Sequence, residues 1–109
     1  MADRFMANNW TIPVWLETEV RERDKTCVYC RVKFTPAKVS RKSVASWEHI
    51  INDATIISRE NTVLCCCSCN ASKGQKQLSV WLRTKYCKVR GITSASVVSM
   101  IKQAISNGQ

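Results

Sequence analysis

Apolar residues recur at helical spacing in the first and last thirds of the chain. The first predicted helix begins at Pro13 and ends near Arg23, with an apolar side formed by Val14, Trp15, Leu16 and Val20. A longer helix is predicted over 78–90 and ends at Gly91, with an apolar stripe of Leu78, Leu82, Tyr86 and Val89. Ser94 is expected to cap a last helix whose buried side contains Val97, Val98, Ile101 and Ile105.

The middle of the chain has a different pattern, which predicts two short strands. Residues 43–51 and 62–66 form these strands, and the segment 52–61 joins them as the long loop of a hairpin. A helix is expected to begin near Ser68, while residues 33–42, which include a proline, are expected to form a loop. The predicted fold class is therefore α+β, with helices on both sides of a central hairpin.

The chain has 109 residues, which suits a single domain over 1–109 with a helical extension at about 78–107. Seventeen lysines and arginines oppose eight acidic residues, giving a net charge of +9. All eight acids lie at or before Glu60, whereas residues 61–109 carry seven cations and no acid. This asymmetry favours a polyanionic partner, and nucleic acid in particular, over a basic face that is merely solvated.

Membrane and export signals are not expected in this sequence. It contains no apolar stretch of eighteen residues, and its first residues lack an apolar run behind a basic flank. The protein is therefore expected to be cytoplasmic, with no membrane partner. In that reducing compartment the seven cysteines are better interpreted as metal ligands or core residues than as disulfides.

Two Cys-x-x-Cys pairs, Cys27–Cys30 and Cys66–Cys69, are separated by 35 residues. Two such turns can place four thiolates around one zinc ion, and a site filled by four protein ligands is structural. A redox role for one pair is the alternative interpretation, but nothing else in the sequence has a thioredoxin-like pattern. The remaining cysteines are expected to behave as small apolar residues: Cys65, Cys67 and Cys87.

Further polar residues with possible chemistry lie between and beside these pairs. The only histidine, His49, directly follows Glu48 near the end of the first predicted strand. Asn61 opens the second strand, and Asn70 follows Cys69 at the beginning of a predicted helix. Taken alone, a histidine beside a glutamate is more often a surface pair than a catalytic site.

Three segments together resemble the HNH endonuclease family. They are 23–30 (RDKTCVYC), 47–51 (WEHII) and 60–74 (ENTVLCCCSCNASKG), within a region of similarity at about 13–76. The resemblance is to the variant in which asparagine replaces the final histidine beside a four-cysteine zinc site. It implies the ββα-metal fold, a β-hairpin and one helix around a divalent metal ion.

The resemblance also implies roles for individual residues. His49 matches the general base, Glu48 the acidic metal ligand, Asn61 the residue that pins the hairpin loop, and Asn70 the second metal ligand. One carboxylate and one amide oxygen are hard ligands, so Mg²⁺ or Mn²⁺ is the expected catalytic cofactor beside structural Zn²⁺. Asp53, in the loop after His49, is expected to form a turn, with a role near the metal as the alternative.

The expected activity is metal-dependent cleavage of DNA. A neutral imidazole can deprotonate water near pH 7, so cleavage should rise through the histidine titration range. One active site cuts one strand, so a monomer should nick, whereas a double-strand break needs a homodimer or two encounters. The expected DNA-contacting residues are basic: Lys73, Lys76, Arg83, Lys85, Lys88 and Arg90. The alternative is a non-catalytic zinc module that binds nucleic acid.

Overall fold

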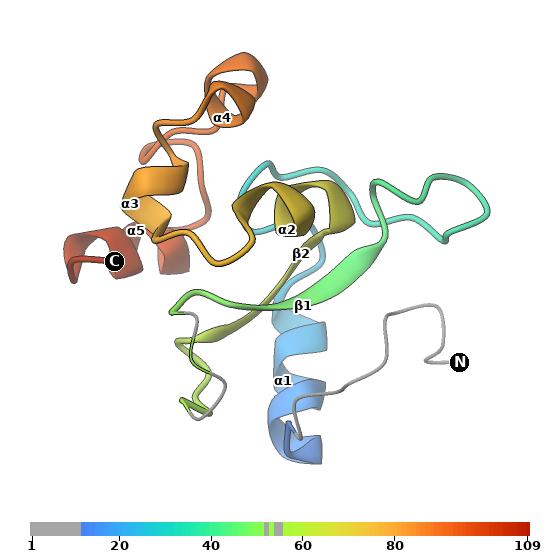
Figure 1. Cartoon of the computed structure of the whole chain (residues 1–109). Coiled ribbons are helices and arrows are strands. Elements are labelled where there is room, and N and C mark those ends of the chain that lie inside the picture. Colours follow the sequence, from blue (N-terminus) through green and yellow to red (C-terminus); the bar gives the residue numbers. More distant parts are fainter. Residues whose placement is uncertain (1–11, 52, 54–55) are drawn as a thin grey trace.

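The computed structural model describes residues 12–51, 53 and 56–109 (Figure 1). Residues 1–11 and loop positions 52, 54 and 55 lie outside the described residues. In the described part, a two-stranded antiparallel sheet is combined with five helices, which confirms the α+β class. The elements are α1 Val14–Arg23, β1 Ala45–His49, β2 Thr62–Cys66, α2 Cys67–Lys73, α3 Leu78–Trp81, α4 Lys85–Arg90 and α5 Ser99–Ser106.

Strands β1 and β2 form the centre of the molecule. They pair from Ala45 opposite Cys66 to His49 opposite Thr62, and every residue of both strands is buried. The first strand is shorter than the predicted 43–51, because pairing stops at His49 and the chain turns into the hairpin loop. A sheet buried on both faces needs a layer on each side.

Helix α1 covers one face of this hairpin. Leu16 and Val20 of α1 pack there against apolar residues of both strands, namely Ala45, Trp47 and Leu64. The apolar side predicted for α1 is only partly correct, since Val14 and Trp15 are exposed. The Trp15 ring instead lies under the Arg59 guanidinium, whose central carbon is 5.6 Å from the ring centroid.

Helix α2 follows β2 without a connecting loop, one residue earlier than the predicted start at Ser68. Cys66 is its N-cap, and the Cys66 sulfur accepts a hydrogen bond from the Cys69 backbone N–H at 3.4 Å. The helix ends at Gly74, whose φ of 52° lies in the left-handed region that favours glycine. The direct connection makes α2 pack back against the hairpin from which it emerges (Figure 1).

The prediction of one continuous helix over 78–90 is wrong. The structure has two short helices, α3 and α4, separated by a turn in which the Thr84 hydroxyl donates to the Trp81 carbonyl at 2.7 Å. The break lets Trp81 enter the core and meet Tyr29 edge-on, with the ring centroids 4.9 Å apart. It also changes the direction of α4, so Val89, predicted to belong to the apolar stripe, is 74% exposed.

The last helix, α5, begins later than the predicted cap at Ser94. Side chains of Thr93 and Ser96 bond to backbone groups of a turn at this point, which competes with helix formation. The predicted buried side is otherwise largely right, because Val97 and Ile101 are fully buried. In the part of the chain that the structure describes, no helix is both long and apolar enough to cross a membrane.

Candidate metal centres and the hairpin site

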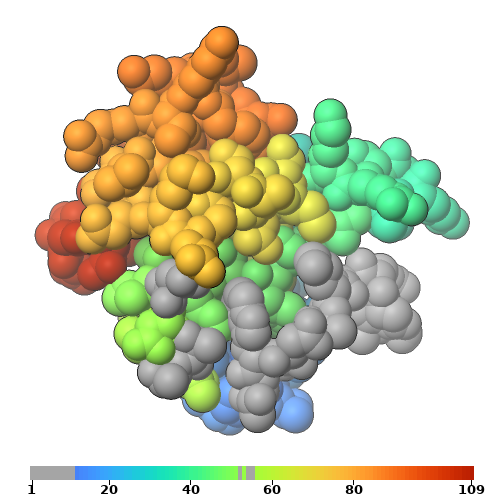
Figure 2. Space-filling view, viewed as in Figure 1, coloured from blue at the N-terminus to red at the C-terminus, as the bar shows by residue number. Residues whose placement is uncertain are grey.

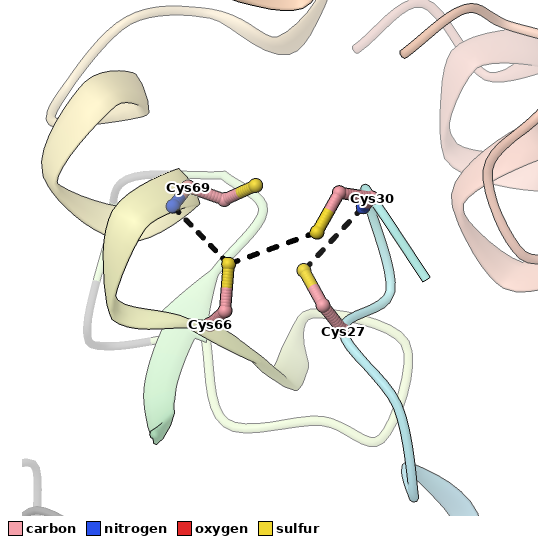
Figure 3. A group of neighbouring side chains, drawn as sticks. All are labelled: Cys27, Cys30, Cys66 and Cys69. Atoms are coloured by element: carbon pink, nitrogen blue, oxygen red, sulfur yellow. Dashed lines mark hydrogen bonds between the residues drawn. The ribbon is translucent and has the colours of Figure 1, made fainter. Parts of the chain in front are cut away.

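Two cysteine pairs that are distant from each other in sequence meet at one end of the hairpin (Figure 3). Their sulfur atoms all lie within 4.8 Å of one another, and the Cys30 and Cys66 sulfurs are 3.7 Å apart. A tetrahedron with sulfurs about 2.3 Å from zinc has edges of about 3.8 Å. The predicted four-cysteine cluster is therefore confirmed, and its donors fit a metal ion such as zinc.

Both halves of the cluster have the same local geometry. The backbone N–H of Cys30 donates to the Cys27 sulfur at 3.4 Å, and the N–H of Cys69 donates to the Cys66 sulfur at the same distance (Figure 3). Such bonds stabilise negative charge on a sulfur atom. Each Cys-x-x-Cys turn thus directs one backbone donor at its first sulfur.

The thiols of the cluster control one another's ionisation. Hydrogen bonding with Cys27 lowers the pKa of Cys30 and of Cys66. Hydrogen bonding within the cluster raises the pKa of Cys27 and of Cys69 well above the ordinary value. Four thiolates at this separation repel one another, so full ionisation of the cluster requires a cation between the sulfurs.

The other three cysteines stay outside the cluster. Cys65 and Cys87 are fully buried in the apolar core, as predicted, and burial raises the pKa of both thiols. Cys67 is only half-buried. Among Cys65, Cys66 and Cys67, the sequence spacing therefore identified the correct cluster member.

Helix α4 reaches the cluster through one hydroxyl group. The Tyr86 O–H donates to the Cys69 sulfur at 3.4 Å and lies 2.8 Å from the Ser68 hydroxyl. The Arg90 guanidinium covers the Tyr86 ring at 4.5 Å and donates to the Ser68 hydroxyl at 3.3 Å. Tyr86 therefore connects α4 to the cysteine cluster. Hydrogen bonds donated to a metal ligand by surrounding residues stabilise that ligand, so the Tyr86 hydroxyl is expected to support Cys69.

Replacing Tyr86 by phenylalanine is expected to weaken metal retention without unfolding the protein. The ring packing stays, but Cys69 loses a donor, so the zinc-loaded variant should lose metal to a coloured chelator about tenfold faster. Circular dichroism of the same sample checks that the fold is intact. A release rate equal to that of the wild type would show that this hydroxyl does not support the cluster.

Glu48, the predicted metal ligand, takes part in a buried ion pair. Its Oε2 atom is 2.8 Å from the Lys73 ammonium and accepts a hydrogen bond from the Tyr29 hydroxyl at 3.1 Å. Lys73 is 0% exposed and also donates to the Ile50 carbonyl at 3.3 Å. Burial raises the pKa of Glu48, although Lys73 and Tyr29 act in the opposite direction.

Lys73 was predicted to contact DNA, and its position corrects that prediction. A side chain that is fully buried and paired with Glu48 does not present its charge at the surface. The residue lies three positions after Asn70 on α2, and residues at this spacing share a helix face. That spacing could have indicated that Lys73 faces the hairpin together with Asn70.

Asn70, the second predicted metal ligand, faces the same strand. Its side-chain nitrogen donates to the Ser46 hydroxyl at 2.9 Å and to the Trp47 carbonyl at 3.3 Å. Among the described residues, nothing donates to Asn70 Oδ1 or to Glu48 Oε1. Carboxylate and amide oxygens are donor types that a hard cation such as Mg²⁺ or Mn²⁺ prefers, and a metal ion at this place stays a prediction.

His49 occupies the last position of β1. By strand alternation its side chain leaves β1 on the face opposite that of Glu48. It is 6% exposed. Burial lowers the pKa of His49, with Asp53 acting weakly against this, so the imidazole is neutral at pH 7 and can accept a proton.

Asn61 fixes the loop that follows His49. Its Oδ1 accepts from the Ile51 backbone N–H at 2.7 Å, and its side-chain nitrogen donates to the Ile51 and Ile56 carbonyls, each at 3.3 Å. The side chain thus pins the hairpin loop as expected. A contribution of Asn61 to catalysis stays a prediction.

The other predicted DNA-contacting residues lie at the surface. They belong to α4 and to the segments on either side of α3, and all are exposed: Lys76, Arg83, Lys85, Lys88 and Arg90. No acidic side chain of the described residues forms an ion pair with any of them. They therefore leave a net positive surface over the C-terminal half.

Comparisons with known proteins identify no relative. No family model, curated protein or solved structure matches the chain. The resemblance to HNH endonucleases therefore rests on the motif residues alone.

Proposed function

We propose that the protein is a metal-dependent DNA endonuclease of the HNH type that nicks one strand. The observation that carries this proposal is the packing of α2 against β1. It brings the Lys73 ammonium to the Glu48 carboxylate and the Asn70 amide to the Trp47 carbonyl, so both side chains contact the strand that ends at His49. An amide and an ammonium group of α2 thereby contact the strand that carries a carboxylate and an imidazole, in a strongly basic protein.

The proposed roles follow from the chemistry of each group. Neutral His49 takes a proton from the attacking water, because its lowered pKa keeps the imidazole unprotonated at neutral pH. Asn61 limits motion of the adjoining loop and so helps to fix the position of His49. A Mg²⁺ or Mn²⁺ ion held by Glu48 Oε1 and Asn70 Oδ1 would supply charge neutralisation at the phosphate.

Zinc is proposed for the cysteine cluster, in a structural role. All four donors are thiols, which favour zinc over magnesium, and together they complete a tetrahedral shell. The cluster joins the segment before β1 to the start of α2. It therefore holds the helix that carries Asn70 in place.

A specific observation favours the second candidate, a non-catalytic zinc module that binds nucleic acid. Lys73 already neutralises Glu48 in the interior, and a divalent ion beside this ammonium is repelled by it. In such a module the Glu48–Lys73 pair would be a structural element. The exposed cations of the C-terminal half would then carry the whole function.

Replacing His49 by alanine is expected to lower plasmid nicking at least about a hundredfold, because the general base is lost. The assay follows conversion of supercoiled plasmid to open circles with Mg²⁺, Mn²⁺, Ca²⁺ or Zn²⁺ added. Lys102→Ala, an exposed position on α5, is the matched control and should nick normally. Equal nicking by the His49 variant would remove His49 from the mechanism, and no nicking by the wild type with any ion would favour the second candidate.

A further inference from the structure

The loop between the first cysteine pair and β1 is strongly basic. Residues 31–42, called here the basic loop, contain five cations and no acid: Arg31, Lys33, Lys38, Arg41 and Lys42. All five are exposed, and none forms an ion pair with a described acidic residue. The Arg31 side chain donates to the Ser96 carbonyl at 3.4 Å, which leaves its charge without a counter-ion among the described residues. The loop therefore concentrates uncompensated positive charge.

The basic loop is built on a fixed base. Phe34 at its start packs against both apolar cores of the molecule. The Thr35 backbone N–H donates to the Ser43 carbonyl at 3.1 Å, which closes the base of the loop. Around Pro36, the N–H groups of Val39 and Ser40 donate to the proline carbonyl and form the tip. Little ordering entropy would thus be lost when a ligand binds.

The end of the loop is attached directly to α2. The Lys42 carbonyl accepts from the Ser68 N–H at 3.2 Å, and the Val44 carbonyl accepts from the Cys67 N–H at 3.0 Å. The loop projects from the body on one side of α2, and α4 lies on the other side (Figures 1 and 2). Two basic elements therefore flank the helix that carries Asn70.

We propose that the basic loop is a second contact for the DNA backbone, so that a duplex lies across α2 between this loop and α4. This inference rests on the proposed function for its partner and extends it to the binding surface. Evenly spaced phosphates suit separated groups of lysine and arginine, which give affinity without sequence preference. A DNA duplex held by both the basic loop and α4 would have one of its two strands directed towards the end of β1.

Salt dependence of DNA binding tests this proposal. The loop variant Lys38→Ser/Arg41→Ser removes two loop charges, and Lys25→Ser/Lys102→Ser removes two exposed charges outside the loop and α4 as the matched control. Binding of a fluorescent duplex is measured by anisotropy over a range of salt concentrations, without added divalent ion. The plot of log affinity against log salt should become shallower by about 0.9 for each phosphate that the variant no longer neutralises, hence by up to about 1.8 in the loop variant.

The outcomes separate this inference from the function on which it rests. A shallower slope in the loop variant alone supports the second contact. A loop variant that keeps the slope of the control, while the wild type still binds and nicks DNA, overturns the loop proposal only. A wild type that binds no duplex overturns both proposals.

Discussion

Replacing Cys66 by serine is expected to abolish metal binding and to unfold the protein at room temperature. Cys66 is both a member of the four-sulfur cluster and the N-cap of α2, so one substitution removes a ligand and a helix cap. Zinc bound to four thiolates contributes about 10–16 kcal/mol in small zinc domains, as much as or more than the whole stability of a typical domain. Metal content by mass spectrometry and far-UV circular dichroism measure the two effects.

Cys67→Ser is the matched control for this experiment. It makes the same chemical change one residue further along, at a half-buried cysteine outside the cluster. This control should retain one zinc per chain and a cooperative unfolding transition. A Cys66→Ser protein with one bound zinc and an unchanged melting temperature would mean that the cluster does not support the fold.

Replacing Lys73 by methionine is expected to lower the free energy of unfolding by about 3–5 kcal/mol at pH 7. The methionine fills a similar volume but leaves the Glu48 carboxylate buried without its cation. Urea denaturation at constant pH measures the change.

Lys76→Met is the matched control, because it makes the same substitution three residues further along. Lys76 lies just after α2, in the exposed segment between Gly74 and Gln77. Its side chain donates to the Ser72 carbonyl at 3.2 Å, and its removal leaves no buried carboxylate unpaired. The control should therefore change the free energy of unfolding by less than about 0.5 kcal/mol.

The effect of Lys73→Met should depend on pH. Burial already raises the pKa of Glu48, and loss of the ammonium raises it further. A carboxyl group with a raised pKa in the folded state destabilises the fold as the pH rises above the pKa of the unfolded state. The loss in free energy of unfolding caused by Lys73→Met should therefore shrink below about pH 4.3, the ordinary pKa of glutamate. Below this pH the Glu48 carboxyl group is protonated in both the folded and the unfolded state.

A double variant and a metal titration complete this test. Glu48→Gln/Lys73→Met removes both charges and should recover much of the lost stability, even where Lys73→Met alone does not fold. Mn²⁺ should raise the melting temperature of Lys73→Met more than that of the wild type, since the repelling ammonium is gone. A Lys73→Met protein as stable as the Lys76→Met control would contradict a stabilising ion pair.

The cysteine cluster shows how much local spacing can reveal. Two Cys-x-x-Cys pairs in a chain with seven cysteines predicted which four sulfurs meet, because each turn presents two sulfurs on one side. The hairpin was predictable from its strand pattern, and the resemblance to HNH endonucleases implied that Asn61 pins its loop, which it does within ten residues of the groups that it binds. Such features depend on short stretches of chain.

The burial of Lys73 and the break between α3 and α4 were not predictable in this way. A lysine near the end of a helix looks like a surface residue until the partner carboxylate, 25 positions earlier, is known to face it. The 78–90 pattern likewise suits one helix until Trp81 is seen to need a place beside Tyr29. Long-range packing decided both features, and between α3 and α4 it outweighed local helix propensity.

The sequence by itself determined the fold class, the four sulfur ligands and the excess of positive charge, because composition, spacing and periodicity are properties of the chain alone. Only the tertiary structure decided which charged groups enter the interior. It paired Lys73 with Glu48 and left the cations of the basic loop exposed. The physical reason is that a charge is tolerated inside a protein only beside a partner, and folding alone determines which partners meet.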